Sequence, residues 1–339
     1  MRVGLIGMNY KLLGLEFRER FAREAKNMLE GDFHVSSGIP FVLLSTCNRT
    51  EIYFSTEDLA EGHSRILAKL KQEIGDFADH HLYSYFGEEC FNHLAEVTTG
   101  ADSVIFGETE IQRQVKESYE KASFSQNLPS CLHFMFQKSL KIGKEVRTSF
   151  SLPKSHVSLE STLSDLIRYF FGSKKDASIL FVGFSEINRK IISFLKKKGF
   201  VNLYLTTRNK EAAEKNSFDL SCQFVDWLNI SYWPKFDIVI TGSLASQYLL
   251  RQDHLLGKEP CLIQTRLVID LSVPRNVDPL VGKHPSILLF NMEEVNFFID
   301  QKQRGIHKEK EKLKKKIVES VSLQLDLYRD KKNKVFVCA

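Results

Sequence analysis

The sequence lacks a long apolar run. A helix that crosses a bilayer needs about 20 consecutive, mostly apolar residues, and polar residues interrupt every apolar stretch of this chain well before that length. The first residues, MRVGLIGMNY, also lack the apolar segment and the small-residue cleavage site of a secretory signal peptide. We therefore expect a cytoplasmic protein that makes no contact with a membrane.

Cysteine is scarce and irregularly spaced. The six cysteines include no CxxC pair, so the spacing typical of a structural zinc site is missing. They also form no regular framework of the kind that disulfides build in small secreted proteins. The sequence predicts no metal site, and it predicts free thiols in a reducing compartment.

Most of the chain carries no net excess of positive or negative charge. The formal net charge is +5, and segment 300–316, DQKQRGIHKEKEKLKKK, carries eight basic and three acidic residues. Its excess of five equals the charge of the whole chain, so the protein is not globally basic. A solvated helix face is the simpler interpretation of such a Lys/Glu-rich segment. Attraction of a polyanion is the alternative.

Residues 1–150 predict an α+β domain. The run RVGLIG and the apolar runs on both sides of polar residues 45–51 predict strands, and residues 16–29 predict a helix. A second helical face is formed at intervals of four, four and three by Ile111, Val115, Tyr119 and Ala122. A strand–helix–strand–strand order of this type is typical of an antiparallel sheet.

Residues 151–291 predict a doubly wound domain of the Rossmann type. Four apolar runs predict buried strands, at 178–182, 202–206, 236–241 and 267–271. Stretches long enough for helices separate them, and the first ends at Gly199, a favourable helix C-terminus. Alternation of strands and helices indicates a parallel sheet with helices on both faces. The chain is thus expected to be a multidomain α/β protein.

Residues 292–339 predict one long helix without proline. Its sparse apolar stripe suits a helix that packs along another element, and it consists of Val295, Ile299, Ile306, Leu313, Ile317, Val321 and Leu325. Gly305 would cost about 1 kcal/mol relative to alanine inside that helix. Because Ile299, Ile306 and Leu313 are seven residues apart, a coiled-coil seam is an alternative.

The turn after the first strand of the second domain has the position of a dinucleotide-binding turn. Its sequence, VGFSEIN, contains Gly183, but Ser185 and Asn188 replace the second and third glycines of GxGxxG. After the next strand comes LTTRNK, in which Arg208 stands where an NAD site has an acidic residue. A cation there suits a 2′-phosphate, so we expect NADP, although a surface arginine would look the same.

A cysteine stands at the polar end of a predicted strand, in FVLLSTCNRTEIYF. A lone cysteine is most often a small buried apolar residue. Arg49, two residues after Cys47, would lower the pKa of the thiol and favour the nucleophilic thiolate. A thiolate in one domain and NADP in the other indicate reductive acyl chemistry, in which a thioester forms and a hydride reduces it to an aldehyde.

Four stretches resemble the glutamyl-tRNA reductase family, in the family's order. They are LEFRERFA (15–22), STCNRTEIY (45–53), HLAEVTTGADSVIFGETEIQRQVK (93–116) and DLSVPRNVDP (270–279). The resemblance implies a catalytic domain, an NADPH-binding domain and a long helix that begins a truncated dimerisation region. The corresponding expected boundaries are 1–150, 151–291 and 292–339.

The resemblance also implies an activity and partners. The family reduces glutamyl-tRNA(Glu) to glutamate-1-semialdehyde with NADPH, through a cysteine thioester, in the first step of the C5 route to tetrapyrroles. The implied partners are glutamyl-tRNA(Glu), glutamate-1-semialdehyde aminomutase and a second copy of the chain. Two alternatives stay open. One is an NADP oxidoreductase of the shikimate dehydrogenase type, and the other is a non-catalytic relative that binds tRNA.

The residues of the implied site follow from the matching motifs. Cys47 matches the nucleophile, and His93 matches a histidine important for activity, which could assist proton transfer. The implied substrate contacts are Thr46, Asn48, Arg49, Ser103, Glu108, Thr109, Glu110 and Gln114. The implied cofactor contacts are Gly183, Phe184, Ser185, Glu186, Ile187, Asn188 and Arg208. Thr109 and Glu110 depart from the family's usual Pro-Gln pair.

Overall fold

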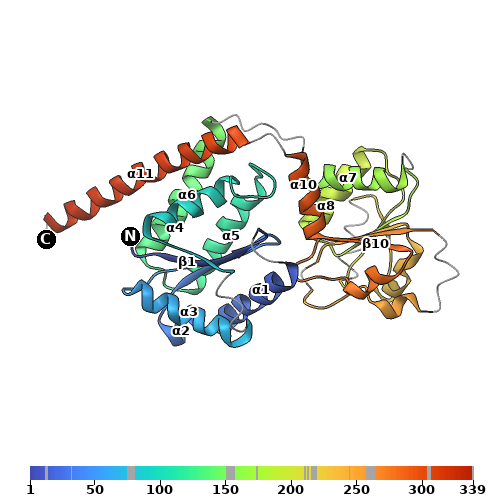
Figure 1. Ribbon diagram of the computed structural model, residues 1–339, viewed down its shortest axis with the longest axis horizontal. Coiled ribbons are helices and arrows are strands. Elements are labelled where there is room, and N and C mark those ends of the chain that lie inside the picture. The colour runs from blue at the N-terminus through green and yellow to red at the C-terminus, as the bar shows by residue number, and fades with distance from the viewer. Residues whose placement is uncertain are drawn as a thin grey trace. The chain divides into compact units, whose positions relative to one another are not determined.

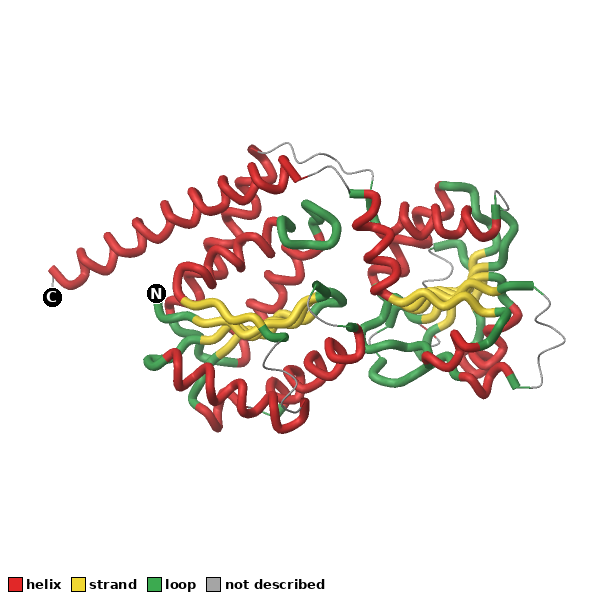
Figure 2. Tube along the Cα trace, in the orientation of Figure 1, coloured by secondary structure: helices red, strands yellow, loops and turns green. Residues whose placement is uncertain are grey.

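The chain divides into two units in a computed structural model (Figures 1 and 2). Unit 1 comprises Met1–Ser155 and Gln303–Ala339, and unit 2 comprises His156–Lys302. The described residues are 1–11, 14–31, 33–74, 81–149, 157–172, 175–209, 211, 214, 220–243, 245–256, 264–303 and 307–337. Among them, no helix combines the length and the hydropathy that spanning a membrane requires.

Unit 1 is built on a four-stranded antiparallel sheet, as the sequence predicted. Its strands are β1 (Gly4–Asn9), β2 (Phe41–Ser45), β3 (Arg49–Phe54) and β4 (Tyr83–Phe86), in the order β2-β3-β1-β4. Ser45 pairs with Thr50 across the β2–β3 turn, and Asn9 at the end of β1 pairs with Arg49. The turn that carries Cys47 therefore lies at the edge of the sheet where β1 ends.

Helices cover both faces of this sheet (Figure 1). One face carries α1 (Leu15–Glu30), α2 (Phe33–Ser37) and α3 (Leu59–Ile74), and the other carries α4 (Gly87–Thr99), α5 (Glu110–Ser125) and α6 (Ser130–Ser149). Because side chains alternate along a strand, Ile6 and Ile52 join the core under α1 and α3. Their neighbours Leu5 and Tyr53 join the core under α4, α5 and α6.

The helix predicted from Met292 onward is two helices in the structure, and the prediction of one continuous helix was wrong. Helix α10 (Met292–Lys302) belongs to unit 2 and α11 (His307–Val337) to unit 1. Gln303 is a turn residue: its amide oxygen accepts the Phe106 N–H at 3.2 Å, and its amide nitrogen donates to the Val104 carbonyl at 3.0 Å. Ile306 lies outside the described residues.

The predicted stripe packs along other helices of the same chain. On α11 it buries Leu313, Ile317, Val321 and Leu325 against α4 and α6. Leu313 is therefore already covered within unit 1, which argues against the coiled-coil alternative. Two lysines of the basic segment also have partners within unit 1. Lys314 forms an ion pair with Glu96 at 3.2 Å, and Lys310 lies over the Phe106 ring.

Unit 2 contains a six-stranded, all-parallel sheet with the strand order of a Rossmann fold. The strands are β5 (Ile179–Val182), β6 (Leu203–Thr206), β7 (Gln223–Phe224), β8 (Ile238–Thr241), β9 (Arg266–Asp270) and β10 (Ile287–Asn291). Their order is β10-β9-β8-β5-β6-β7, which reverses direction between β5 and β8. The four predicted strands are confirmed, whereas β7 and β10 were not predicted.

The remaining described elements of unit 2 are helical. Helix α7 (Leu159–Phe171) precedes the sheet, and α8 (Glu186–Lys197) confirms the helix expected before Gly199. Three short 3-10 helices follow: η2 (Trp227–Lys235), η3 (Gln252–Leu255) and η5 (Pro279–Lys283). Together the two units confirm a multidomain α/β protein with a doubly wound domain and a long C-terminal helix.

The packing of α11 predicts a difference between two neighbouring substitutions. Ile317 is fully buried and Val318 is 48% exposed. Replacing a buried isoleucine with alanine typically costs about 2–5 kcal/mol, because apolar contact is lost and a cavity remains. We expect Ile317→Ala to lower the urea midpoint of unfolding and to speed hydrogen exchange in α4 and α6. Val318→Ala should leave both unchanged, and equal effects of the two variants would contradict this packing.

Candidate active site

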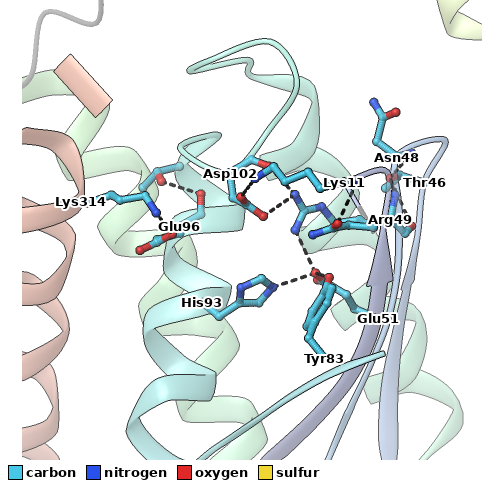
Figure 3. Close-up of polar contacts among 12 residues, drawn as sticks. Lys11, Thr46, Asn48, Arg49, Glu51, Tyr83, His93, Glu96, Asp102 and Lys314 are labelled. Carbon is cyan, nitrogen blue, oxygen red and sulfur yellow. Dashed lines mark hydrogen bonds and ion pairs between the residues drawn. The ribbon is translucent and has the colours of Figure 1, made fainter. Parts of the chain in front are cut away.

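The turn between β2 and β3 is held by its own polar groups (Figure 3). The Thr46 hydroxyl oxygen accepts the N–H groups of Asn48 and Arg49, each at 3.2 Å. The Thr46 N–H donates to the Arg49 carbonyl at 2.8 Å, and the Tyr10 N–H donates to the Asn48 carbonyl at 2.9 Å. The turn is therefore closed internally and fastened to the end of β1.

Cys47 is half-buried on this turn, and its thiol is not activated in the way the sequence predicted. Burial, followed by the charge of Glu108, raises the pKa of the Cys47 thiol to about 11. Arg18 and Arg49 oppose this rise without overcoming it. The expectation that Arg49 lowers the pKa of the thiol is confirmed, but burial and Glu108 outweigh this effect.

A buried carboxylate, Glu51, lies behind the turn and was not singled out from the sequence. It is 0% exposed and accepts four hydrogen bonds, from Arg49 Nη1 at 2.9 Å, the Tyr53 and Tyr83 hydroxyls at 2.6 Å each, and His93 Nε2 at 2.8 Å. Burial alone would raise the pKa of Glu51, but Arg49 and His93 hold it well below its usual range. Glu51 is therefore ionised.

This network determines the tautomer of His93. An ionised carboxylate can only accept hydrogen bonds, so Nε2 of His93 must carry the proton that contacts Glu51 (Figure 3). The ring also stacks on Tyr85, with centroids 4.9 Å apart. When the imidazole is neutral, Nδ1 is left as its acceptor.

A glycine lets the network span β1. Gly7 pairs with both Glu51 and Tyr83 in the sheet. A Cβ atom placed on Gly7 would lie 2.6 Å from the Tyr83 ring and 3.0 Å from Glu51 Cγ. Only glycine therefore allows these two side chains to meet over the intervening strand.

Arg49 is committed to two carboxylates. Its side chain is 2% exposed, and besides Glu51 it contacts Asp102, through Nη2 to Oδ2 at 3.0 Å and to the backbone oxygen at 2.6 Å. Lys11 Nζ, half-exposed, contacts the other Asp102 oxygen at 2.5 Å. Asp102 and Lys11 were missed by the sequence reasoning, although Asp102 directly precedes Ser103 in the second motif.

The loop before α5 carries Ser103 and Glu108, and the charge of Glu108 acts on the Cys47 thiol. Ser103 hydrogen-bonds the Glu108 carboxyl group, and burial raises the pKa of Glu108 against the opposing influence of Ser103 and Arg49. Arg147 donates to the Glu108 backbone oxygen at 2.6 Å. Among the other predicted contacts, Thr109 is exposed at the N-cap of α5, Glu110 pairs with Arg113, and Gln114 follows one turn later.

In unit 2, the turn between β5 and α8 is closed by side chains where the dinucleotide motif has glycines. Gly183 has φ +93°, and a Cβ there would lie 2.7 Å from Ser243 Cβ. Ser185 caps α8 by accepting the Asn188 N–H at 3.2 Å. Buried Asn188 donates to the carbonyls of Val182 and Gly183 at 3.2 and 2.8 Å. Phe184, Glu186 and Ile187 are half-buried beside them.

The surroundings of this turn fit a nicotinamide dinucleotide. The turn lies at the carboxyl end of β5, where the strand order reverses, and at the N-terminus of α8, which favours phosphate. Among the described residues, Asn188 Oδ1 and Thr206 Oγ1 are buried polar atoms without a hydrogen-bond partner. A Cβ on Gly242 would lie 2.7 Å from Asn188 Oδ1, so that glycine keeps the approach open.

Arg208 occupies the predicted position just after β6. It is exposed, and its guanidinium lies 5.5 Å from the centroid of the Trp227 ring. This cation–π contact holds the charge beside the carboxyl end of the sheet. Trp227 was not singled out from the sequence, and Lys210 lies outside the described residues.

The third motif makes a rigid loop after β9. The buried Asp270 accepts the Thr241 hydroxyl at 2.6 Å and the N–H groups of Ser272, Asn276 and Val277 at 2.8–3.0 Å. The Asn276 side-chain oxygen in turn accepts the hydroxyl groups of Ser243 and Ser272. This motif therefore shapes the backbone beside the switch point between β5 and β8.

Two family models match the chain. The model of the glutamyl-tRNAGlu reductase N-terminal domain matches residues 6–150, and that of shikimate/quinate 5-dehydrogenase matches residues 165–297. The second match covers only the dinucleotide-binding part, so the shikimate dehydrogenase alternative leaves the first 150 residues unexplained.

Similar proteins cover most of the chain. It is 34% identical to the glutamyl-tRNA reductase of Chlamydia abortus over 89% of this chain and 86% of that protein. It is 29% identical to the Aquifex aeolicus glutamyl-tRNA reductase over 87% of this chain and 74% of that protein. The solved glutamyl-tRNA reductase of Methanopyrus kandleri shares the fold, with a TM-score of 0.54 at 24% identity over 99% of this chain and 83% of that one. The chain belongs to the glutamyl-tRNA reductase family and is an oxidoreductase.

Proposed function

We propose that the protein reduces glutamyl-tRNA(Glu) to glutamate-1-semialdehyde with NADPH, through a thioester at Cys47, as the first step of tetrapyrrole synthesis. The observation that carries this proposal is the Cys47 turn, which is fastened to β1 and faced by Arg18, Arg49 and Glu108. A nucleophile held this rigidly, with charged groups on several sides, is arranged for attack on a polar acyl group.

In the proposed reaction, Cys47 Sγ attacks the carbonyl carbon of the aminoacyl ester. The bond from that carbon to the ribose oxygen breaks, the ribose oxygen takes a proton, and the tRNA leaves with a thioester remaining on Cys47. Because burial holds the pKa of the thiol near 11, the thiol must lose its proton as it attacks. His93, held by Glu51 through Nε2, keeps an acceptor nitrogen for proton transfer.

The remaining predicted residues would hold the glutamyl group. They are Thr46, Asn48, Arg49, Ser103, Glu108, Thr109, Glu110 and Gln114. Arg49 is the natural partner of a carboxylate, but both of its terminal nitrogens contact Glu51 and Asp102. A substrate carboxylate would therefore have to share Arg49 with Asp102 or displace it.

NADPH would bind at the β5–α8 turn, with Gly183, Ser185 and Asn188 around the pyrophosphate and Arg208 beside the 2′-phosphate. When bound, it supplies the hydride that converts the thioester into the aldehyde and releases the Cys47 thiolate. The aldehyde product suits glutamate-1-semialdehyde aminomutase as a partner. The non-catalytic alternative predicts binding of glutamyl-tRNA without NADPH oxidation. Oxidation with glutamyl-tRNA, compared with free glutamate, separates the two.

The nucleophile assignment predicts the effect of Cys47→Ser. A serine hydroxyl is a far poorer nucleophile than a thiolate, so we expect NADPH oxidation to fall to background while the circular dichroism spectrum is retained. Wild-type protein without NADPH should carry a glutamyl thioester on the Cys47 peptide, detectable by mass spectrometry. Cys131→Ser, at another half-buried cysteine of unit 1, should keep wild-type activity. Substantial reduction by Cys47→Ser would eliminate the thioester mechanism.

The position of Arg208 predicts a cofactor preference. A hydrogen bond to a charged group contributes roughly 1.5–3 kcal/mol, so Arg208→Ala should raise the KM for NADPH about ten- to a hundredfold and scarcely change that for NADH. The matched control is Lys235→Ala. Lys235 is an exposed cation just before β8, and its Nζ lies over the Tyr232 ring, 4.6 Å from the centroid. An equal response of the two cofactors to Arg208→Ala would assign Arg208 a structural role instead.

A further inference from the structure

A buried arginine from α1 reaches the Cys47 turn. Arg18 is 4% exposed, and its Nη1 donates to the Cys47 carbonyl oxygen at 2.9 Å. Arginine is almost never fully buried unless it is paired. The contact joins residues 29 positions apart, so the fold of α1 against the sheet is what brings this charge to the turn.

Arg18 completes the restraint of a single peptide group. The Cys47 carbonyl and the Asn48 N–H belong to the same planar peptide unit. Arg18 holds the carbonyl oxygen, and the Thr46 hydroxyl oxygen holds the N–H at 3.2 Å. With both ends held, rotation of the peptide plane after Cys47 is resisted, so the backbone that carries Sγ is restrained on this side.

Arg18 is also the principal favourable charge near the thiol. Three charged groups act on the thiol: Arg18 from α1, Arg49 from β3 and Glu108 from the loop before α5. Arg18 lowers the pKa of the thiol more than Arg49 does. Nη1 of Arg18 contacts the backbone of Cys47 itself, whereas the terminal nitrogens of Arg49 contact Glu51 and Asp102.

We propose that Arg18 is a positioning residue for the thioester chemistry: it locks the Cys47 peptide and places the positive charge that stabilises the thiolate. This inference rests on the proposed function. It assigns the activating cation to the first helix of the chain instead of to the arginine two residues after the cysteine. A charge-assisted hydrogen bond of this kind is stronger and more directional than a neutral one.

The test measures the thiol directly. Alkylation of Cys47 by iodoacetamide, followed by mass spectrometry of its peptide across a pH series, reports the fraction of thiolate without any tRNA or NADPH. We expect Arg18→Met to slow alkylation at neutral pH about tenfold, which corresponds to a rise of about one unit in the pKa of the thiol. Arg18→Lys, which keeps the charge but loses the planar fork, should fall between Arg18→Met and wild type.

Two further measurements separate positioning from folding. Arg23→Met removes an exposed arginine from the same helix and should leave the alkylation profile unchanged. In glutamyl-tRNA deacylation without NADPH, Arg18→Met should lower kcat about tenfold, in line with the loss of thiolate, and leave KM unchanged. If Arg18→Met does not fold, the alkylation profile of Arg18→Lys tests the proposal instead. An Arg18→Lys profile identical to that of the wild type overturns it.

Failure of this inference is distinguishable from failure of the proposed function. Alkylation profiles of Arg18→Met and Arg18→Lys that coincide with wild type overturn the role of Arg18, while Cys47→Ser still tests the thioester. Wild-type protein that does not react with glutamyl-tRNA overturns the proposed function, while the alkylation profile still shows whether Arg18 stabilises the thiolate.

Discussion

The candidate active site of unit 1 depends on one buried carboxylate. Glu51 collects donors from β3, β4 and α4, so a single charge connects the middle of the sheet to the helix above it. Leaving such a charge unpaired in the interior would cost several kcal/mol. Each donor is therefore constrained by the need to satisfy it. That constraint fixes the fork of Arg49, the tautomer of His93 and the orientation of two tyrosines, and it requires Gly7 on the strand between them.

The charged residues around the site have different roles. Arg49 has the position in the sequence of an activating cation, but its contacts with Glu51 and Asp102 make it a structural link between the strand and the loop after α4. Burial and then the charge of Glu108 raise the pKa of the Cys47 thiol, and Arg18 and Arg49 only oppose that rise. A thiol with a raised pKa is mostly protonated at neutral pH, and this limits its side reactions because the thiolate is the reactive form.

Much of the fold was readable from the sequence because buried parallel strands appear as uninterrupted apolar runs. Strand β7 was missed because its two residues are too few to show a hydrophobic pattern. The end of α10 was missed because the helix ends where Gln303 hydrogen-bonds Phe106, a residue far away in the sequence. Cys47 was singled out as the candidate nucleophile through its motif. The partners Lys11, Arg18 and Asp102 were not, because only folding brings them together. Glu51 could have been noticed: it lies two residues before Tyr53, on a strand face that the period of two turns toward the core.

Unit 1 is assembled from two stretches of chain, with all of unit 2 between them. The ribosome therefore releases the sheet, α4 and α6 long before α11, which covers their apolar surface with Leu313, Ile317, Val321 and Leu325. During that interval the domain that carries Cys47 has an open flank, and such transiently exposed surfaces favour aggregation or chaperone binding. Unit 1 can reach its final packing only after the whole of unit 2 has been synthesised, so the synthesis of α11 sets the moment at which the Cys47 domain can close its core.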